Sequence, residues 1–106
     1  MNIKLVEHIY FVGIGGIGMS ALARYFNAKG KRVSGYDKTP SILTDELTSE
    51  GVSLHFDENH IPNDIKESNF QSVLIVYTPA VSKDSLQLQF FNSKKWNVIK
   101  LSLIHI

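Results

Sequence analysis

The sequence contains no cysteine, so disulfide bonds and thiolate metal sites are excluded, and a reducing compartment fits this absence. It has no apolar run long enough to cross a membrane, and no apolar leader followed by a small-residue cleavage site. Neither sign of charge dominates, because the net charge is +1 and acidic and basic residues are interspersed. A basic stripe of the kind that binds nucleic acid is therefore missing. We expect a soluble cytoplasmic domain with neither a nucleic-acid nor a membrane partner.

A glycine-rich stretch near the start of the chain is the most informative part of the sequence. The apolar residues 9–12 predict a buried strand, and residues 20–29 have helical spacing that ends at Gly30. Between them lies a Gly-x-Gly-x-x-Gly loop, which consists of Gly13, Ile14, Gly15, Gly16, Ile17 and Gly18.

In the order strand, turn and helix, this loop predicts phosphate binding. Gly13 permits a sharp turn, Gly15 lets a diphosphate approach the backbone, and Gly18 lets the helix pack closely on the strand. Gly16 widens the open backbone surface, and the amides at the helix start favour an anion. A plain strand-to-helix turn without a ligand is the alternative interpretation.

Strands and helices alternate along the whole chain. This pattern predicts a Rossmann-like α/β fold, in which an open parallel sheet of about five strands has helices on both faces and forms a single domain. The predicted strands are residues 9–12, 31–37, 52–56, 73–77 and 96–101, and the predicted helices are residues 20–29, 42–50 and 84–95.

Three polar residues are candidates for the same site. Asp37 follows the second predicted strand at the distance from Gly18 where an acidic residue commonly accepts hydrogen bonds from ribose, although it could instead form a turn. Thr78 follows the strand 73–77 and should lie at the same sheet edge, either as a contact or as part of a rigid turn. His60 lies in a polar loop, where a histidine is usually only solvated. No nucleophile or metal-ligand cluster appears, so no catalytic or metal-binding residue is predicted.

Other residues carry structural expectations. His8 precedes the first strand and is expected to be exposed. Ser20 is expected to cap the first helix or to meet a phosphate, and Ser41 or Thr39 to cap the second. Arg24 is expected to be a solvated charge on the polar face of the first helix.

Several of these stretches together resemble the Mur ligases. Residues 10–23 are similar to the opening of that family, and the Gly-Gly-x-Gly-Met-Ser segment of residues 15–20 is the most specific part. The Val-Ser-Gly-Tyr-Asp of residues 33–37, the Asn-His of residues 59–60 and the turn after the strand at residues 76–81 follow in the family's order. The resemblance spans residues 8–100 and favours the alanine-adding branch of the family.

The resemblance implies a function for the domain. The family's N-terminal domain binds the UDP moiety of UDP-N-acetylmuramate, so residues 13–18 would hold the diphosphate, Asp37 would lie at the uridine, and His60 and Thr78 would line the nucleotide. The full-length family members use ATP and Mg²⁺ to phosphorylate the substrate carboxylate, and the amine of L-alanine then displaces the phosphate. This reaction belongs to peptidoglycan precursor synthesis.

Two departures from the family pattern limit what the resemblance implies. The chain contains no Gly-x-x-x-x-Gly-Lys-Ser/Thr, the loop that cradles ATP phosphates, and residues 101–106 break the family's pattern. We therefore expect residues 1–106 to be the N-terminal substrate-binding domain without the ATP-binding central and C-terminal domains, and to be inactive alone. The alternatives are an NAD-binding oxidoreductase domain, which would use the same glycines and Asp37, and a nucleotide-sensing regulatory module.

Overall fold

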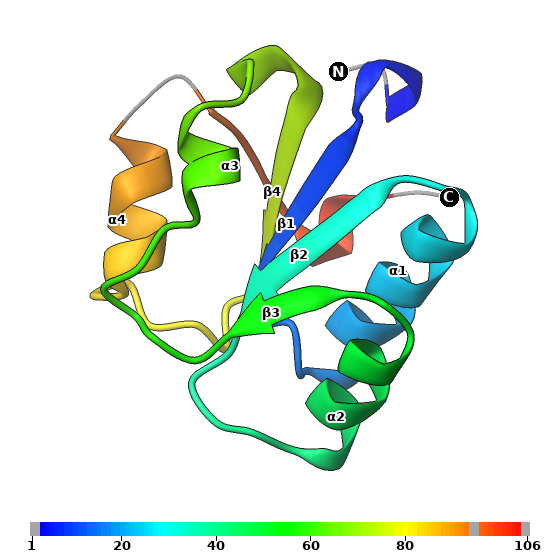
Figure 1. The fold of residues 1–106 in the computed structure, drawn as a ribbon. Coiled ribbons are helices and arrows are strands. Elements are labelled where there is room, and N and C mark those ends of the chain that lie inside the picture. The colour runs from blue at the N-terminus through cyan, green and yellow to red at the C-terminus, as the bar shows by residue number, and fades with distance from the viewer. Residues whose placement is uncertain (1–2, 94–95, 105–106) are drawn as a thin grey trace.

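The computed structural model describes residues 3–93 and 96–104, which form one five-stranded parallel sheet with helices on both faces (Figure 1). The strand order is β3-β2-β1-β4-β5, and every neighbouring pair is parallel. The strands are β1 (His8–Val12), β2 (Arg32–Tyr36), β3 (Ser53–His55), β4 (Val73–Tyr77) and β5 (Asn97–Lys100). The helices are α1 (Ile17–Ala28), α2 (Ile42–Ser49), α3 (Asn63–Lys66) and α4 (Leu86–Asn92), with 3-10 turns η1 (Ile3–Leu5), η2 (Phe70–Ser72) and η3 (Leu101–Leu103). The predicted Rossmann-like fold class is confirmed.

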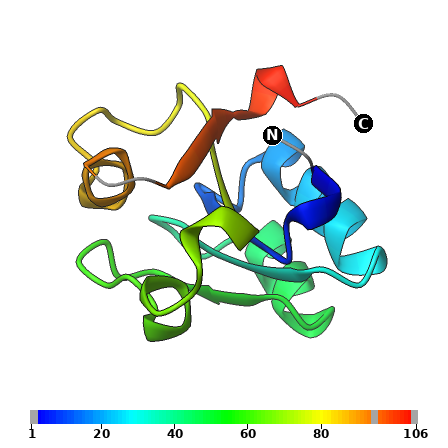
Figure 2. The same ribbon diagram turned by 90° about the horizontal axis from the view of Figure 1, so that it is seen from above.

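The sheet is buried on both faces because its central strand is apolar on both. Ile9 and Phe11 of β1 belong to the core under α1 and α2, whereas Tyr10 and Val12 belong to a second core under α3 and α4. Figure 2 shows the two pairs of helices on opposite sides of the sheet. Alternate residues of one strand therefore supply two separate cores, as the two-residue period of a strand requires.

Strand register brings the carboxyl ends of the central strands to one level. Val12 of β1 lies beside both Tyr36 of β2 and Tyr77 of β4. The residues that follow these three, including Asp37, start together at one edge of the sheet. In open parallel sheets this edge is where ligands bind.

Helix α1 begins three residues earlier than the sequence predicted. Gly16 is its N-cap residue and has no side chain to form a capping hydrogen bond. Ser20 lies one turn inside the helix, and its hydroxyl donates to the carbonyl oxygen of Ile17 at 3.1 Å. The capping role expected of Ser20 is therefore wrong. Glycine has low helix propensity, so the sequence predicted a helix start that is too late. Packing of the buried Met19 stabilises the first turn of α1.

The predicted cap of α2 is confirmed at Ser41. Its hydroxyl accepts a 3.2 Å hydrogen bond from the Thr44 amide, and the Thr44 hydroxyl accepts a 2.8 Å bond from the Ser41 amide. This reciprocal capping box satisfies two amides at the helix start. Arg24, expected to be only solvated, instead pairs with Glu46 and Glu50 and links α1 to α2 at the surface.

His8 is buried, which contradicts the expectation that it is exposed. It forms the first residue of β1 rather than part of the lead, and its Nε2 lies 2.7 Å from the Ser34 hydroxyl on β2. Within the described residues, its buried Nδ1 has no hydrogen-bond partner. Burial, followed by the nearby Arg32 guanidinium, lowers the pKa of His8, while Asp64 partly opposes this. The folded state therefore favours the neutral imidazole.

The stability of the domain is expected to fall as the pH falls below the ordinary histidine value of 6.5. Because the folded-state pKa of His8 is lowered, the unfolded chain binds the proton more readily, and acid favours unfolding. Urea unfolding at about pH 7.5 and about pH 5.5 measures the slope with which the free energy of unfolding changes with pH. His8→Gln is expected to reduce the slope without removing it, because the pKa of His55 is lowered too. An unchanged slope in His8→Gln would contradict the assignment to His8.

Within residues 3–93 and 96–104, no helix is long and apolar enough to span a membrane.

Candidate functional site

The glycine loop is folded by hydrogen bonds to the end of β2. Gly13 has a positive φ of 92°, a conformation that L side chains rarely adopt. The amides of Gly13 and Ile14 both donate to the Tyr36 carbonyl oxygen, at 2.7 and 3.0 Å. The Ile14 side chain is fully buried and packs against Gly35 of β2. The neighbouring strand therefore fixes the turn before any ligand is present.

Asp37 is the polar residue that the structure brings closest to this loop. Its Oδ2 accepts a 2.7 Å hydrogen bond from the Gly15 amide, and its Oδ1 accepts a 3.0 Å bond from the Thr39 amide. The bond to the Thr39 amide forms a turn, which is the structural role that the sequence analysis gave as the alternative for Asp37. An ionised carboxylate has about four acceptor positions, so about two remain for a ligand hydroxyl.

The first turn of α1 offers the amides that an anion would meet. Gly16 donates to the Gly13 carbonyl oxygen at 3.2 Å, so the amides of residues 13–16 are all engaged within the protein. The amides of Ile17, Gly18 and Met19 belong to the first helical turn, where backbone N–H groups have no partner inside the helix. The positive end of the helix dipole lies at the same place. The loop can therefore bind an anion chiefly through the start of α1.

The turn after β4 packs on the glycine loop. The Val81 amide donates to the carbonyl oxygen of the half-buried Thr78 at 3.0 Å and closes this turn. A Cβ placed on Gly13 would lie 3.0 Å from Cγ2 of Val81. The structure therefore brings the segment that begins at Thr78 against the glycine loop, as the edge argument predicted. Sequence reasoning did not identify Val81 as the residue that makes this contact.

His60 lies near the carboxyl edge of the sheet because its ring contacts His55, a residue that the sequence analysis did not identify. The exposed His60 ring lies 5.0 Å from the ring of His55, and the His55 ring lies 5.6 Å from that of Tyr36 (centroid distances). His55 ends β3 and pairs in register with Tyr36. Its place at the carboxyl end of a predicted strand was the available signal. Within residues 3–93 and 96–104, no hydrogen bond or ring contact joins His60 directly to the glycine loop or Asp37.

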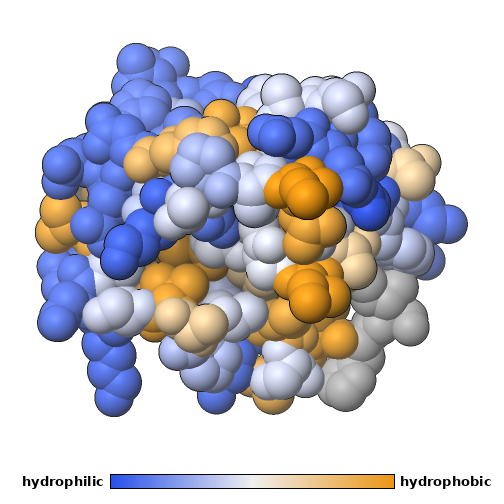
Figure 3. All heavy atoms as spheres, turned by 90° about the horizontal axis from the view of Figure 1, so that it is seen from below, coloured by the Kyte–Doolittle hydropathy of each residue, from blue (hydrophilic) through white to orange (hydrophobic). Residues whose placement is uncertain are grey.

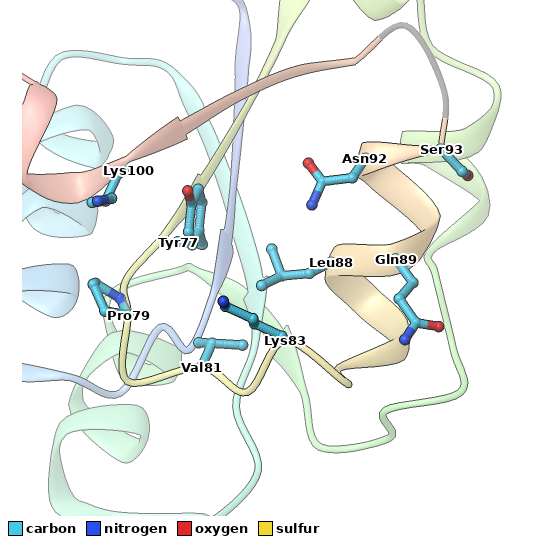
Figure 4. A pocket seen from close by; sticks show the side chains of 9 residues that line it. All are labelled: Tyr77, Pro79, Val81, Lys83, Leu88, Gln89, Asn92, Ser93 and Lys100. Atoms are coloured by element: carbon cyan, nitrogen blue, oxygen red, sulfur yellow. The ribbon is translucent and has the colours of Figure 1, made fainter.

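A cavity of about 600 Å³ opens between α4 and the carboxyl ends of β4 and β5 (Figure 4). In Figure 4 Tyr77 of β4 and Leu88 of α4 face this space, and Lys83 extends along it from the turn. None of the nine predicted site residues lines the cavity. The glycine loop and Asp37 therefore lie outside the lining of this cavity, although Val81, which lines it, packs against Gly13.

The carboxyl edge also exposes apolar side chains, which Figure 3 shows from that side of the molecule. Ile17 and Ile42 begin α1 and α2, Leu103 follows β5, and their exposed fractions are 84%, 76% and 60%. Leu101 approaches the start of α1, because a Cβ on Gly18 would lie 3.0 Å from its Cδ2. Apolar surface thus flanks the start of α1 at the candidate site.

A parallel sheet with helices on both faces and a glycine-rich turn into α1 defines a Rossmann-like domain. The chain belongs to the Mur ligase family, because the family model described as the Mur ligase family, catalytic domain, matches residues 8–104. It is 50% identical over 102 residues to the UDP-N-acetylmuramate–L-alanine ligase of Flavobacterium psychrophilum, a match that covers 94% of this chain and 22% of that ligase. The ligase of the same name from Porphyromonas gingivalis is 50% identical over 97 residues, with 90% of this chain and 21% of that ligase covered. The chain thus spans about a fifth of the length of these relatives.

Solved structures of Mur ligases share the fold. UDP-N-acetylmuramate-alanine ligase MurC from Thermotoga maritima superposes with a TM-score of 0.70 at 27% identity, over 90% of this chain and 21% of that chain. The UDP-N-acetylmuramate:L-alanyl-gamma-D-glutamyl-meso-diaminopimelate ligase from Neisseria meningitides gives a TM-score of 0.71 at 22% identity, over 91% of this chain and 29% of that chain. At that identity the second likeness supports the fold alone.

Proposed function

We propose that this chain binds the UDP moiety of UDP-N-acetylmuramate, as the N-terminal domain of an ATP-dependent ligase that adds L-alanine to that substrate. The hydrogen bond from the Gly15 amide to Asp37 is the observation that best supports this proposal, because it joins the two motifs expected at diphosphate and uridine. The 50% identity to ligases of that name supports the choice of substrate.

Each predicted residue has a role in this proposal. The diphosphate lies over the loop of residues 13–18 and accepts hydrogen bonds from the first-turn amides of α1. The remaining acceptor positions of Asp37 bind the uridine half, and His60 and Thr78 flank the nucleotide. The acetylmuramate half extends away from the loop, toward the domains that complete the enzyme.

The chemical step belongs to other domains in this proposal. The chain has no Gly-x-x-x-x-Gly-Lys-Ser/Thr, so we place the ATP and Mg²⁺ sites outside residues 1–106. The apolar surface beside the start of α1 suits contact with such a domain. We expect the chain alone to bind the UDP moiety without forming the amide bond, and the full-length enzyme to act in cytoplasmic peptidoglycan precursor synthesis.

Calorimetric titration of the chain with UDP, UDP-N-acetylmuramate and NADH in parallel tests the proposal. Both uridine ligands are expected to bind, and NADH is expected to give no heat of binding. Binding of NADH alone would support a dehydrogenase domain instead and would overturn the proposal. If neither UDP nor UDP-N-acetylmuramate binds, the proposal is also contradicted.

Asp37→Ala is expected to weaken UDP binding by about 1–3 kcal/mol, because the charged acceptor of the Gly15 amide and of the ligand is lost together. The same titration measures the change. Asp84→Ala is a control with the same change of charge, at an exposed carboxylate in the turn before α4, and is expected to keep the wild-type affinity. Equal affinities for the two variants would leave Asp37 with a structural role only.

A further inference from the structure

Gln87 carries a fully buried side-chain amide on the face of α4 that also buries Leu88 and Phe91. Its exposed fraction is 0%, whereas Leu86 before it and Gln89 two residues later are exposed. A polar side chain replaces an apolar one there because its amide has specific partners, as buried polar groups generally do.

The amide of Gln87 joins α4 to the loop that carries His60. Its Nε2 donates to the carbonyl oxygens of Glu58 and His60, at 2.8 and 2.7 Å. Its Oε1 accepts a 2.6 Å hydrogen bond from the hydroxyl of Tyr10 on β1. This orientation of the amide is the only one that works, because carbonyl oxygens can only accept.

These bonds determine which nitrogen of His55 carries its proton. The Tyr10 hydroxyl has one proton, which it donates to Gln87. The 2.9 Å contact between Tyr10 and His55 Nε2 therefore requires the histidine to donate. On the other side of the ring, Nδ1 accepts a 3.3 Å bond from the Asp57 amide. His55 is thus the neutral Nε2–H tautomer.

The environment of His55 is consistent with this neutral form. Burial lowers the pKa of His55 first and the neighbouring His60 ring second, whereas Asp57 partly opposes them. A second proton would lie on Nδ1 and face the Asp57 N–H, so a donor would meet a donor. The ring therefore anchors the start of the loop while Gln87 anchors its end.

We propose that the buried Gln87 and Tyr10 and the half-buried His55 form a polar clamp that positions residues 57–60, and with them His60, for binding of the uridine nucleotide. His55 of β3 reaches the loop at the Asp57 amide, and Gln87 of α4 reaches it at the carbonyl oxygens of Glu58 and His60. Tyr10 of β1 links these two side chains. Gln87 is a positioning residue, because it holds the backbone on both sides of Asn59 and is itself fully buried. This inference rests on the proposed function for its ligand, but the clamp is measurable without any ligand.

The test compares Gln87→Met with Gln89→Met in the 106-residue chain. Methionine keeps the unbranched shape of glutamine but offers neither the two N–H donors nor the carbonyl acceptor. In the ligand-free wild-type chain, ¹⁵N NMR is expected to detect the Nε2–H tautomer of His55. In Gln87→Met the carbonyl oxygens of Glu58 and His60 lose their donor, so ¹⁵N relaxation is expected to show increased motion of residues 57–60. UDP affinity is expected to fall roughly tenfold. Gln89→Met makes the same change on the exposed face of the same helix and is expected to leave both readouts unchanged.

An Nδ1–H tautomer in the wild-type chain, or unchanged motion of residues 57–60 together with unchanged UDP affinity in Gln87→Met, would overturn the clamp. If Gln87→Met does not fold, Tyr10→Phe tests the other half of the clamp. It removes the acceptor of His55 Nε2–H, so residues 57–60 are expected to become more mobile and UDP affinity to fall, and no change in either would overturn the clamp. Failure of the wild-type chain to bind UDP would count against the proposed function alone. The tautomer of ligand-free His55 would still decide whether the clamp exists.

Discussion

Replacement of Gly15 by valine is expected to abolish binding of UDP. A Cβ at this position would lie 2.8 Å from Oδ2 of Asp37 and 3.0 Å from Cγ2 of Thr44, so even the first side-chain atom displaces the carboxylate. The 2.7 Å bond between Asp37 and the Gly15 amide is lost, and the larger side chain covers the surface that the diphosphate would approach. The expected loss is about 3 kcal/mol or more, over a hundredfold in Kd, measured by calorimetry.

Gly16→Ala is the control for Gly15→Val, because it adds a side chain within the same loop. A Cβ on Gly16 would have no neighbour closer than 3.6 Å, which is ordinary van der Waals contact. This variant is therefore expected to lose much less affinity than Gly15→Val. Circular dichroism should give both variants the wild-type helix content. Wild-type affinity in a folded Gly15→Val protein would remove the glycine loop from the nucleotide site.

Gly35→Ala is expected to destabilise the whole domain. A Cβ on this residue would lie 2.7 Å from the Phe11 carbonyl oxygen on the neighbouring strand and 2.8 Å from Cδ1 of Ile14. Backbone cannot yield as the tip of a side chain can, so β1 and β2 must separate at the centre of the sheet. Urea unfolding is expected to show a loss of about 3 kcal/mol. An unchanged midpoint would contradict this prediction.

Ser53→Ala on β3 is the control for that substitution. Ser53 lies in the outermost strand with its side chain exposed, so this variant is expected to stay within about 0.5 kcal/mol of wild type. A comparable loss in both variants would mean that the sheet responds to any substitution, and that the contact between Gly35 and Phe11 is not the cause.

Much of the fold could be predicted because apolar runs and glycines act locally. Residues 73–77 were predicted as a strand with the bounds that β4 has, and the cap at Ser41 follows from its own short motif. The grouping of Gly15 and Asp37 followed from the spacing between the glycine motif and the acidic residue after the second strand. Each of these inferences needs only spacing and the geometry of a parallel sheet.

The remaining features depend on partners that lie far apart in the sequence. His8 is buried because Ser34 on another strand meets its ring, and Gln87 is buried because Tyr10 and the loop after β3 supply hydrogen bonds. A polar residue at such a position resembles a surface residue until its partners are known. The missed His55 belongs to the same class, since its contacts come from β1 and β2.

The engagement of the loop amides by Tyr36 and Asp37 has a consequence for hydrogen–deuterium exchange. Because Gly13, Ile14 and Gly15 donate within the protein, their amides should exchange slowly even without nucleotide. The amides of Ile17 and Gly18 should exchange quickly until an anion arrives. Protection would then appear over one helical turn, with no ordering of the loop before it. Such a site incurs little conformational entropy cost on binding, so its affinity is set by the ligand's own contacts.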